Sequence, residues 1–202
     1  MNHRRLFGGV VALLLAITAA QPLEAQRAGA WTWHSKYSTV LGVGDTGDFA
    51  GGFSWRGVTF DVERATSDNV SLGLTFGWHV LDEKSSGTSF FPEGAITGTA
   101  FRYINSAPIL LTGNYYFGDP ASIRPYLGAG AGTYWIENRT EAGVFYVDDS
   151  NWHFGLLGEA GVLIPRPGGS GITLSARYNW AMKTNDVERQ YLTFSIGYLV
   201  GS

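Results

Sequence analysis

The sequence predicts an all-β fold, an eight-stranded antiparallel up-and-down transmembrane β-barrel. Eight segments alternate large apolar residues with small or polar residues at a period of two, as strands with two unlike faces do. Only 15% of the residues are charged, against roughly 25% in ordinary soluble domains. Large aromatic residues gather near the ends of these segments, where a membrane would meet water. The length of 202 residues suits one such domain.

Residues 1–25 have the layout of a secretory signal peptide. Two arginines precede an apolar stretch at 6–20, and a small residue, Ala25, ends the segment. The apolar stretch is shorter than the roughly 20 residues that a membrane-spanning helix needs. We therefore expect export of the chain and cleavage after Ala25, which leaves residues 26–202 as a single barrel domain.

Four strands are expected in the first half of the exported chain. Their ranges are 31–43, 54–64, 70–82 and about 99–117. The first is the least regular. In the second, Val58, Phe60 and Val62 alternate with polar residues, and the third, VSLGLTFGWHV, alternates throughout. The fourth combines a polar-aromatic run with the sequence ILLTGNYYF.

Four more strands complete the expected barrel. Their ranges are 123–137, 151–164, 172–183 and 190–200. The fifth strand, RPYLGAGAGTYW, sets a run of glycines opposite larger residues, whereas the sixth, WHFGLLGEAGVLI, alternates less cleanly. The seventh, ITLSARYNWAM, and the eighth, YLTFSIGY, alternate clearly. One face of the seventh strand carries Arg177 among small and polar residues.

The connections between the expected strands alternate in kind. The compact, turn-forming ones are 65–69, 118–122 and 165–171. The longer ones are 44–53, 83–95 and 138–150, and the last connection, 184–189, is a short exception. An even number of strands places both termini on one side of the membrane. For an exported chain we expect that side to be the periplasm, with the longer connections outside the cell.

Two barrel architectures fit eight alternating strands, and they differ in where the apolar face points. A soluble lipocalin-like barrel turns it inward, whereas a transmembrane barrel turns it toward lipid. The other face carries Gly, Ser and Thr rather than many Lys and Glu, which suits a narrow packed interior. This observation favours the transmembrane barrel.

The aromatic residues also favour a membrane, because they sort into two rims. The rim beside the longer connections would carry Trp55, Trp78, Trp135, Trp152 and Trp180. The opposite rim would carry Tyr115, Phe117 and Tyr198. Two aromatic girdles are what the two interfaces of a bilayer select.

The stretch PILLTGNYYFGDPASIRPYLGAGAGTYW at 108–135 resembles the small eight-stranded outer-membrane barrels of the outer-membrane protein W and opacity-protein type. The resemblance implies an outer membrane of the Gram-negative kind, with lipid and lipopolysaccharide around the barrel and insertion by the barrel assembly machinery. W-type proteins are associated with a hydrophobic channel for small apolar solutes. Such barrels usually end on Phe or Trp, whereas this chain ends on Gly201-Ser202 and leaves Tyr198 as its terminal aromatic residue.

Charged residues on the inward face form the candidate site. Glu159 and Arg177 are equidistant from a turn centred near residue 168, so an antiparallel hairpin would place them opposite each other as an ion pair. Asp61 and Glu63 would add negative charge from across the narrow lumen. This lumen charge network would act as a plug or as the gate of a small pore, and a plug is favoured because eight strands leave little room for water.

The composition argues against an enzyme and against a cofactor or metal site. The chain has no cysteine and no HExxH motif. His79 and His153 are expected to be polar lining. In lipid deacylases of the barrel type, a serine nucleophile follows a histidine in the pattern His-x-Ser. Here Gly155 occupies the position of that serine after His153, so the nucleophile is missing. A net charge of −3 gives no reason to expect nucleic acid as a partner.

Two functions follow from the sequence as hypotheses. The first is an integral outer-membrane barrel that is structural or forms a narrow channel for small, hydrophobic solutes. The alternative is a surface adhesion or binding module, with the barrel as anchor and the longer connections as the active part. Aromatic residues in those connections would form an adhesive tip or extend the strands above the bilayer: Phe90, Phe91, Phe145 and Tyr146.

Overall fold

The computed structural model describes four stretches of the chain, and they hold the whole barrel. These stretches are 28–91, 94–142, 145–185 and 187–201, and within them the backbone alone is described at 84–91, 94–101, 141–142 and 145–147. The signal peptide expected at 1–25 lies outside the described residues, as do the side chains of the four aromatic residues expected at the tips. Within the described stretches, no helix is long and apolar enough to cross a membrane.

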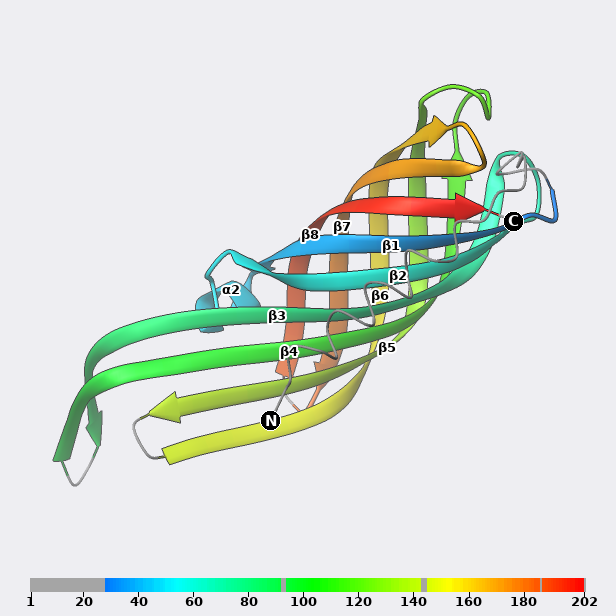
Figure 1. Cartoon of the computed structure of the whole chain (residues 1–202). Helices are drawn as coiled ribbons and strands as arrows, with labels where there is room; N and C mark the ends of the chain where they lie inside the picture. The colour runs from blue at the N-terminus through cyan, green and yellow to red at the C-terminus, as the bar shows by residue number, and fades with distance from the viewer. Residues whose placement is uncertain (1–27, 92–93, 143–144, 186, 202) are drawn as a thin grey trace, which may run out of the picture.

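Eight strands close into one barrel, so the fold class predicted from the sequence is confirmed (Figure 1). The strands are β1 (Trp31–Val43), β2 (Ser54–Ala65), β3 (Val70–Phe91), β4 (Gly94–Tyr116), β5 (Arg124–Ala142), β6 (Phe145–Arg166), β7 (Ser170–Thr184) and β8 (Val187–Gly201). Each strand pairs antiparallel with the next along the chain, and β1 pairs with β8. Closure leaves no sheet edge unpaired, which is the condition for strands to cross lipid.

Two connections expected as loops are in fact paired strands, so the predicted boundaries there are wrong. The segment 83–95 belongs mostly to the β3–β4 hairpin, which pairs out to Phe91 and Gly94. The segment 138–150 belongs to β5 and β6, which pair out to Ala142 and Phe145. Both hairpins run past the ends of the shorter strands (Figure 1). Alternation of residue types is expected only where the two faces of a strand meet different surroundings, so a paired hairpin beyond the closed barrel need not show it.

The remaining long connection, 44–53, contains the short helix α2 (Asp45–Phe49), which the sequence pattern did not predict. Helix α2 lies at the end of the barrel that carries the two long hairpins, which we call the loop rim. The opposite end, with the compact turns, the start of β1 and the end of β8, is the turn rim. Ala50 and the Thr46 side chain are buried, so α2 is packed onto the barrel end.

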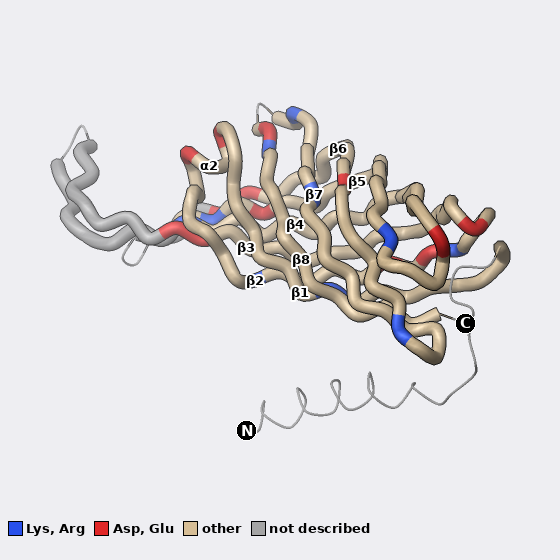
Figure 2. Tube along the Cα trace, turned by 90° about the horizontal axis from the view of Figure 1, so that it is seen from above, with Lys and Arg blue, Asp and Glu red and all other residues tan. Residues whose placement is uncertain are grey.

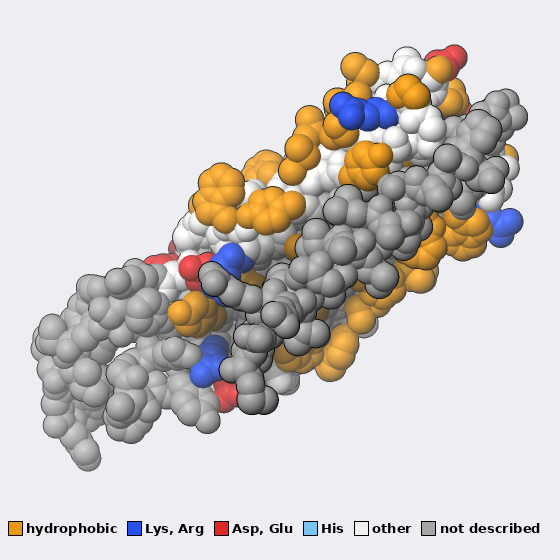
Figure 3. Space-filling view, in the orientation of Figure 1, with side chains coloured by type: hydrophobic (Ala, Val, Ile, Leu, Met, Phe, Trp, Pro, Cys, Tyr) orange, Lys and Arg blue, Asp and Glu red, His pale blue; other side chains and the backbone are white. Residues whose placement is uncertain are grey.

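The two faces of the barrel wall are inverted relative to a soluble barrel. Large apolar side chains point outward, and Leu111 on β4 is the most exposed of them at 70%. Hydrophobic side chains are spread along the barrel wall in the part of the surface that Figure 3 shows in colour. Charged residues lie mostly toward the two ends of the trace, with few along its middle (Figure 2). Arg177, in contrast, is only 2% exposed and points into the lumen.

Candidate functional site: the charged interior

Four charged side chains meet inside the barrel, and we call them the charge quartet: Lys36, Asp61, Glu159 and Arg177. Lys36 Nζ lies 2.8 Å from Asp61 Oδ2 and 2.9 Å from Glu159 Oε1. Arg177 Nη2 lies 2.7 Å from Asp61 Oδ2, and its Nε lies 2.9 Å from Glu159 Oε2. Each cation therefore contacts both carboxylates, and the four charges sum to zero. All four side chains are buried.

The strand register explains how residues so far apart in sequence meet. Glu159 and Arg177 are direct partners in the β6–β7 ladder, as the hairpin argument predicted. Asp61 reaches Arg177 from β2, on another part of the barrel wall. Lys36 on β1 was missed from the sequence. The signal that would have found it is the parity of its neighbours, because Trp33 and Tyr37 point outward and leave the even positions of β1 inward.

Neutral donors complete the bonding of the quartet carboxylates. Tyr126 Oη donates to Glu159 Oε1 at 2.8 Å, and Thr75 Oγ1 donates to Asp61 Oδ1 at 2.7 Å. Buried ion pairs need such additional bonds, since desolvation otherwise outweighs the attraction. The Tyr126 ring fits because residue 161 is glycine: a Cβ there would lie 2.5 Å from the Tyr126 ring carbon Cζ. The glycines of the inward face thus make room for tyrosines that fill the lumen.

Glu63, also predicted for the lumen network, faces inward but contacts a different set of groups. It accepts hydrogen bonds from Ser71 Oγ at 2.5 Å, Asn114 Nδ2 at 2.9 Å and Tyr116 Oη at 3.0 Å. His34 Nε2 lies 3.6 Å from its Oε1. Glu63 therefore lies beside the quartet, nearer the turn rim, and takes no direct part in it.

Polar and apolar side chains fill the interior between the quartet and the loop rim. His79 hydrogen-bonds with Thr59 Oγ1 at 3.0 Å and with Tyr191 Oη at 3.1 Å. His153 Nδ1 lies 3.0 Å from the carbonyl oxygen of Met182. A buried apolar cluster packs around these groups: Val40, Ala50, Leu81, Ile104, Leu110, Tyr134, Ile136, Leu157, Ala181 and Tyr191. Both histidines are polar lining in this geometry.

Helix α2 covers this cluster at the loop rim. Thr46 Oγ1 accepts a hydrogen bond from the Gln190 backbone N–H at 2.8 Å, which ties the helix to β8. The Phe49 ring lies between two cations, 5.3 Å from Arg102 Cζ and 5.1 Å from Arg189 Cζ. Such cation–π contacts hold the helix against the loop rim.

The turn rim is closed in a similar way. Tyr116, Tyr126, Leu163 and Leu199 form a second buried cluster. The Arg124 guanidinium lies 5.3 Å from the centre of the Tyr116 ring and donates to the carbonyl oxygen of Asp68 at 2.8 Å. The lumen is thus packed near both rims and crossed by ion pairs between them.

The predicted girdle residues all lie on the outer wall. At the loop rim, Trp55, Trp78 and Trp152 are exposed and Trp135 and Trp180 are half-buried. The rings of Trp78 and Trp135 pack at 5.8 Å between centroids. At the turn rim, Tyr115, Phe117 and Tyr198 are exposed. That these rings mark the two membrane interfaces stays a prediction.

Comparison with known proteins places this geometry in a family. Residues 10–199 match the family model described as outer membrane protein beta-barrel domain. No curated protein matches the chain. Similar solved structures include the outer membrane protein OprG from Pseudomonas aeruginosa, at 12% identity and TM-score 0.51, covering 89% of this chain and 99% of that one. Another is Neisserial surface protein A, at 15% identity and TM-score 0.51, covering 85% and 95%.

The N-terminal β-barrel domain of Pseudomonas aeruginosa OprF is a third similar structure, at 13% identity and TM-score 0.50, covering 86% of this chain and 99% of that one. At such identities these structures support the fold, and the family match over most of the chain supports the assignment. The resemblance seen in the sequence is therefore confirmed. The chain belongs to the outer membrane protein beta-barrel domain family, which places it in the outer membrane.

Proposed function

We propose that the protein is a structural barrel of the outer membrane with a sealed lumen. The charge quartet is the observation that carries this proposal. Two cations and two carboxylates bridge β1, β2, β6 and β7 across the interior, every contact being 2.9 Å or shorter. The interior of an eight-stranded barrel is only wide enough for side chains to fill.

A path for a solute through this lumen would require the quartet to separate. Each separated charge would remain in a packed interior, away from its partners, at a cost of several kcal/mol. A small apolar solute has no charge or hydrogen bond to offset that cost. The sealed structural role is therefore preferred to the narrow channel, the other form of the leading hypothesis.

Conductance in planar lipid bilayers tests the sealed lumen. We expect no current steps above background from the wild-type barrel or from Arg177→Ala. In the variant, Lys36 still joins Asp61 to Glu159 and the tyrosines still fill the lumen. A porin in the same bilayers is the positive control, and heat-modifiable migration on gels confirms that both samples are folded. Reproducible wild-type steps, altered by Arg177→Ala, would contradict the proposal and support a gated pore.

A second function, surface binding by the long hairpins, is favoured by strand length. Strands β3 and β4 contain 22 and 23 residues, whereas a tilted crossing of a bilayer needs about 9–11. At about 3.3 Å per residue, strands of this length reach well beyond the hydrocarbon core. With the sealed barrel as anchor, the β3–β4 and β5–β6 hairpins would present a paired-strand surface outside the cell.

Shortening one hairpin separates this function from the barrel. Glu83 and Arg102 are direct partners, so residues 84–101 can be replaced by an Asn-Gly turn that suits a two-residue hairpin. We expect the shortened protein to fold and to keep its heat-modifiable migration, while adherence of expressing cells to an epithelial layer falls to the level of cells lacking the protein. A companion variant replaces 141–146 between Thr140 and its partner Val147 and shows whether the β5–β6 hairpin contributes to the same adherence. Unchanged adherence in both variants would argue against surface binding.

A further inference from the structure

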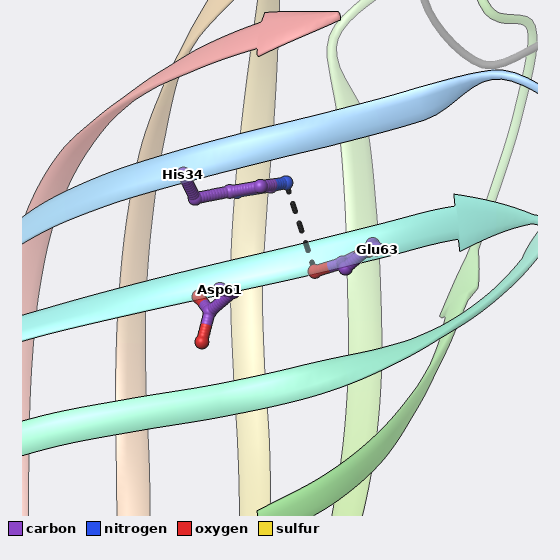
Figure 4. A group of neighbouring side chains, drawn as sticks. All are labelled: His34, Asp61 and Glu63. Atoms are coloured by element: carbon purple, nitrogen blue, oxygen red, sulfur yellow. Dashed lines mark ion pairs between the residues drawn. The ribbon is translucent and has the colours of Figure 1, made fainter.

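We propose that His34, Asp61 and Glu63 form a binding site for a divalent transition-metal cation of the zinc class, inside the barrel near the turn rim (Figure 4). Their ligand atoms, one from each side chain, all lie within 4.8 Å of one another. The sequence pattern pointed to no metal site, because histidine and the two acids are far apart in the chain and match no ligand spacing.

The β1–β2 ladder brings the three residues together. His34 is the direct partner of Asp61, and Glu63 pairs with Thr32, one inward position from His34. All three side chains point into the lumen and are buried. The group therefore lies on two adjacent strands whose backbone pairing fixes its spacing, as Figure 4 shows.

The His34 ring is the strongest sign of a ligand. Its side chain is buried, and neither ring nitrogen has a hydrogen-bond partner among the described residues. His79 and His153, the other buried histidines described, each have at least one ring nitrogen within hydrogen-bond distance of a partner. An unpaired buried polar group costs about 1–3 kcal/mol, so a partner for His34 would stabilise the barrel.

The spacing between His34 and Glu63 suits two ligands of one ion. His34 Nε2 lies 3.6 Å from Glu63 Oε1, which is too long for a hydrogen bond. Two ligand atoms about 2.1 Å from a tetrahedral zinc ion lie roughly 3.4 Å apart. A cation between them therefore requires only small movements of these two side chains.

Hydrogen bonds from other strands hold both carboxylates in place. Glu63 receives donors from Ser71, Asn114 and Tyr116. Among the described residues, Asp61 Oδ1 accepts a hydrogen bond only from Thr75. Its Oδ2 lies in contact with both cations of the quartet. Outer hydrogen bonds of this kind orient metal ligands and tune their basicity. His34 and Glu63 would be the strong ligands, and Asp61 the weaker third, because Lys36 and Arg177 share its charge.

The charge of this region attracts a cation. The quartet is neutral, and Glu63 beside it brings the sum to −1 while His34 is neutral. Uncompensated charge in a packed interior is costly. A proton on His34 would bring the sum to zero and a divalent ion to +1, and the experiment below separates the two.

Refolding of the barrel in the presence of zinc tests the site, because the ion can then reach it before the lumen closes. The chain is expressed without a histidine tag, stripped with a chelator while unfolded and refolded in detergent at neutral pH over a range of ZnCl₂ concentrations, and the zinc retained after removal of free metal is measured. We expect one zinc ion per barrel, and at least roughly tenfold weaker binding in His34→Ala and in Glu63→Gln. His153→Ala, which removes a buried histidine from the opposite half of the barrel, is the matched control and should bind like the wild type.

Two kinds of result would overturn the proposal. Absence of zinc binding, or equal binding by the wild type and His34→Ala, excludes this site. A wild-type barrel that gains stability at mildly acidic pH, through His34, but shows no zinc-dependent shift of its unfolding midpoint has a proton site instead. If His34→Ala does not fold, Glu63→Gln and the zinc-dependent shift of the wild type decide the result.

Discussion

Arg177→Met is expected to lower the free energy of unfolding of the barrel by about 3–5 kcal/mol, because it removes one partner from a buried set of ion pairs. Methionine keeps much of the side-chain volume but leaves Asp61 and Glu159 with Lys36 as their only quartet cation. Denaturant unfolding in lipid vesicles, followed by tryptophan fluorescence and heat-modifiable migration, measures the change.

Two further variants show whether this loss comes from charge. Ser175 lies on the same inward face of β7, and its hydroxyl has no hydrogen-bond partner among the described residues. We therefore expect Ser175→Ala to lower the free energy of unfolding by less than about 1 kcal/mol. Adding Glu159→Leu to Arg177→Met leaves Lys36 and Asp61 as a neutral pair, so the double variant should lose less than the sum of the single changes. Equal losses in Arg177→Met and Ser175→Ala would show that the quartet does not hold the barrel closed.

The sequence predicts contacts within one hairpin well, because a turn sets their register. Gly168 and Gly169 have positive φ angles of 82° and 70°, which a tight turn requires and glycine adopts freely. The register counted back from this turn places Glu159 opposite Arg177, as observed. The contact of Arg177 with Asp61 cannot be found in this way, because it depends on how the whole sheet closes.

The long hairpins and helix α2 were not predicted from the sequence, because neither produces a periodic pattern of apolar residues. Alternation reports a difference between two faces, so it predicts strands where one face meets lipid and the other the packed lumen. Where both faces meet the same surroundings no difference is expected, and the pairing of residues 84–91 with β4 then leaves no alternating pattern to read. Helix α2 is too short to show a helical period, and its position depends on Phe49 meeting Arg102 and Arg189.

Lys36 was not predicted as a lumen residue, because the first strand shows little contrast between its two faces. β1 begins at Trp31 as predicted, but Ser35 and Thr39 share its outward face with two tryptophans and a tyrosine, which weakens the contrast with the inward residues. Lys36 is then only one polar residue among several. Its role becomes visible when β1 pairs with both β2 and β8 and the closed barrel brings it to Asp61 and Glu159.

Leu111→Arg is expected to destabilise the barrel by about 2–4 kcal/mol in a bilayer, the cost of a cation near the midplane on the lipid face. Leu111 points outward from β4, five residues before the strand ends at Tyr116. With a strand tilt of roughly 45°, those residues rise about 12 Å from the turn rim, near the centre of the apolar band. Denaturant unfolding in lipid vesicles gives the difference in free energy from the wild type.

Ile123→Arg is the matched control, because residue 123 is also exposed and apolar but lies outside the strands at the turn rim. A cation near the interface costs about 0–1 kcal/mol, since its side chain reaches water. The depth dependence is the decisive result. In a barrel whose outer face met water, both arginines would be tolerated equally, so equal stability of the two variants would contradict a lipid-facing wall. A large loss at Leu111 alone would place this part of β4 in the hydrocarbon core and the turn rim at its boundary.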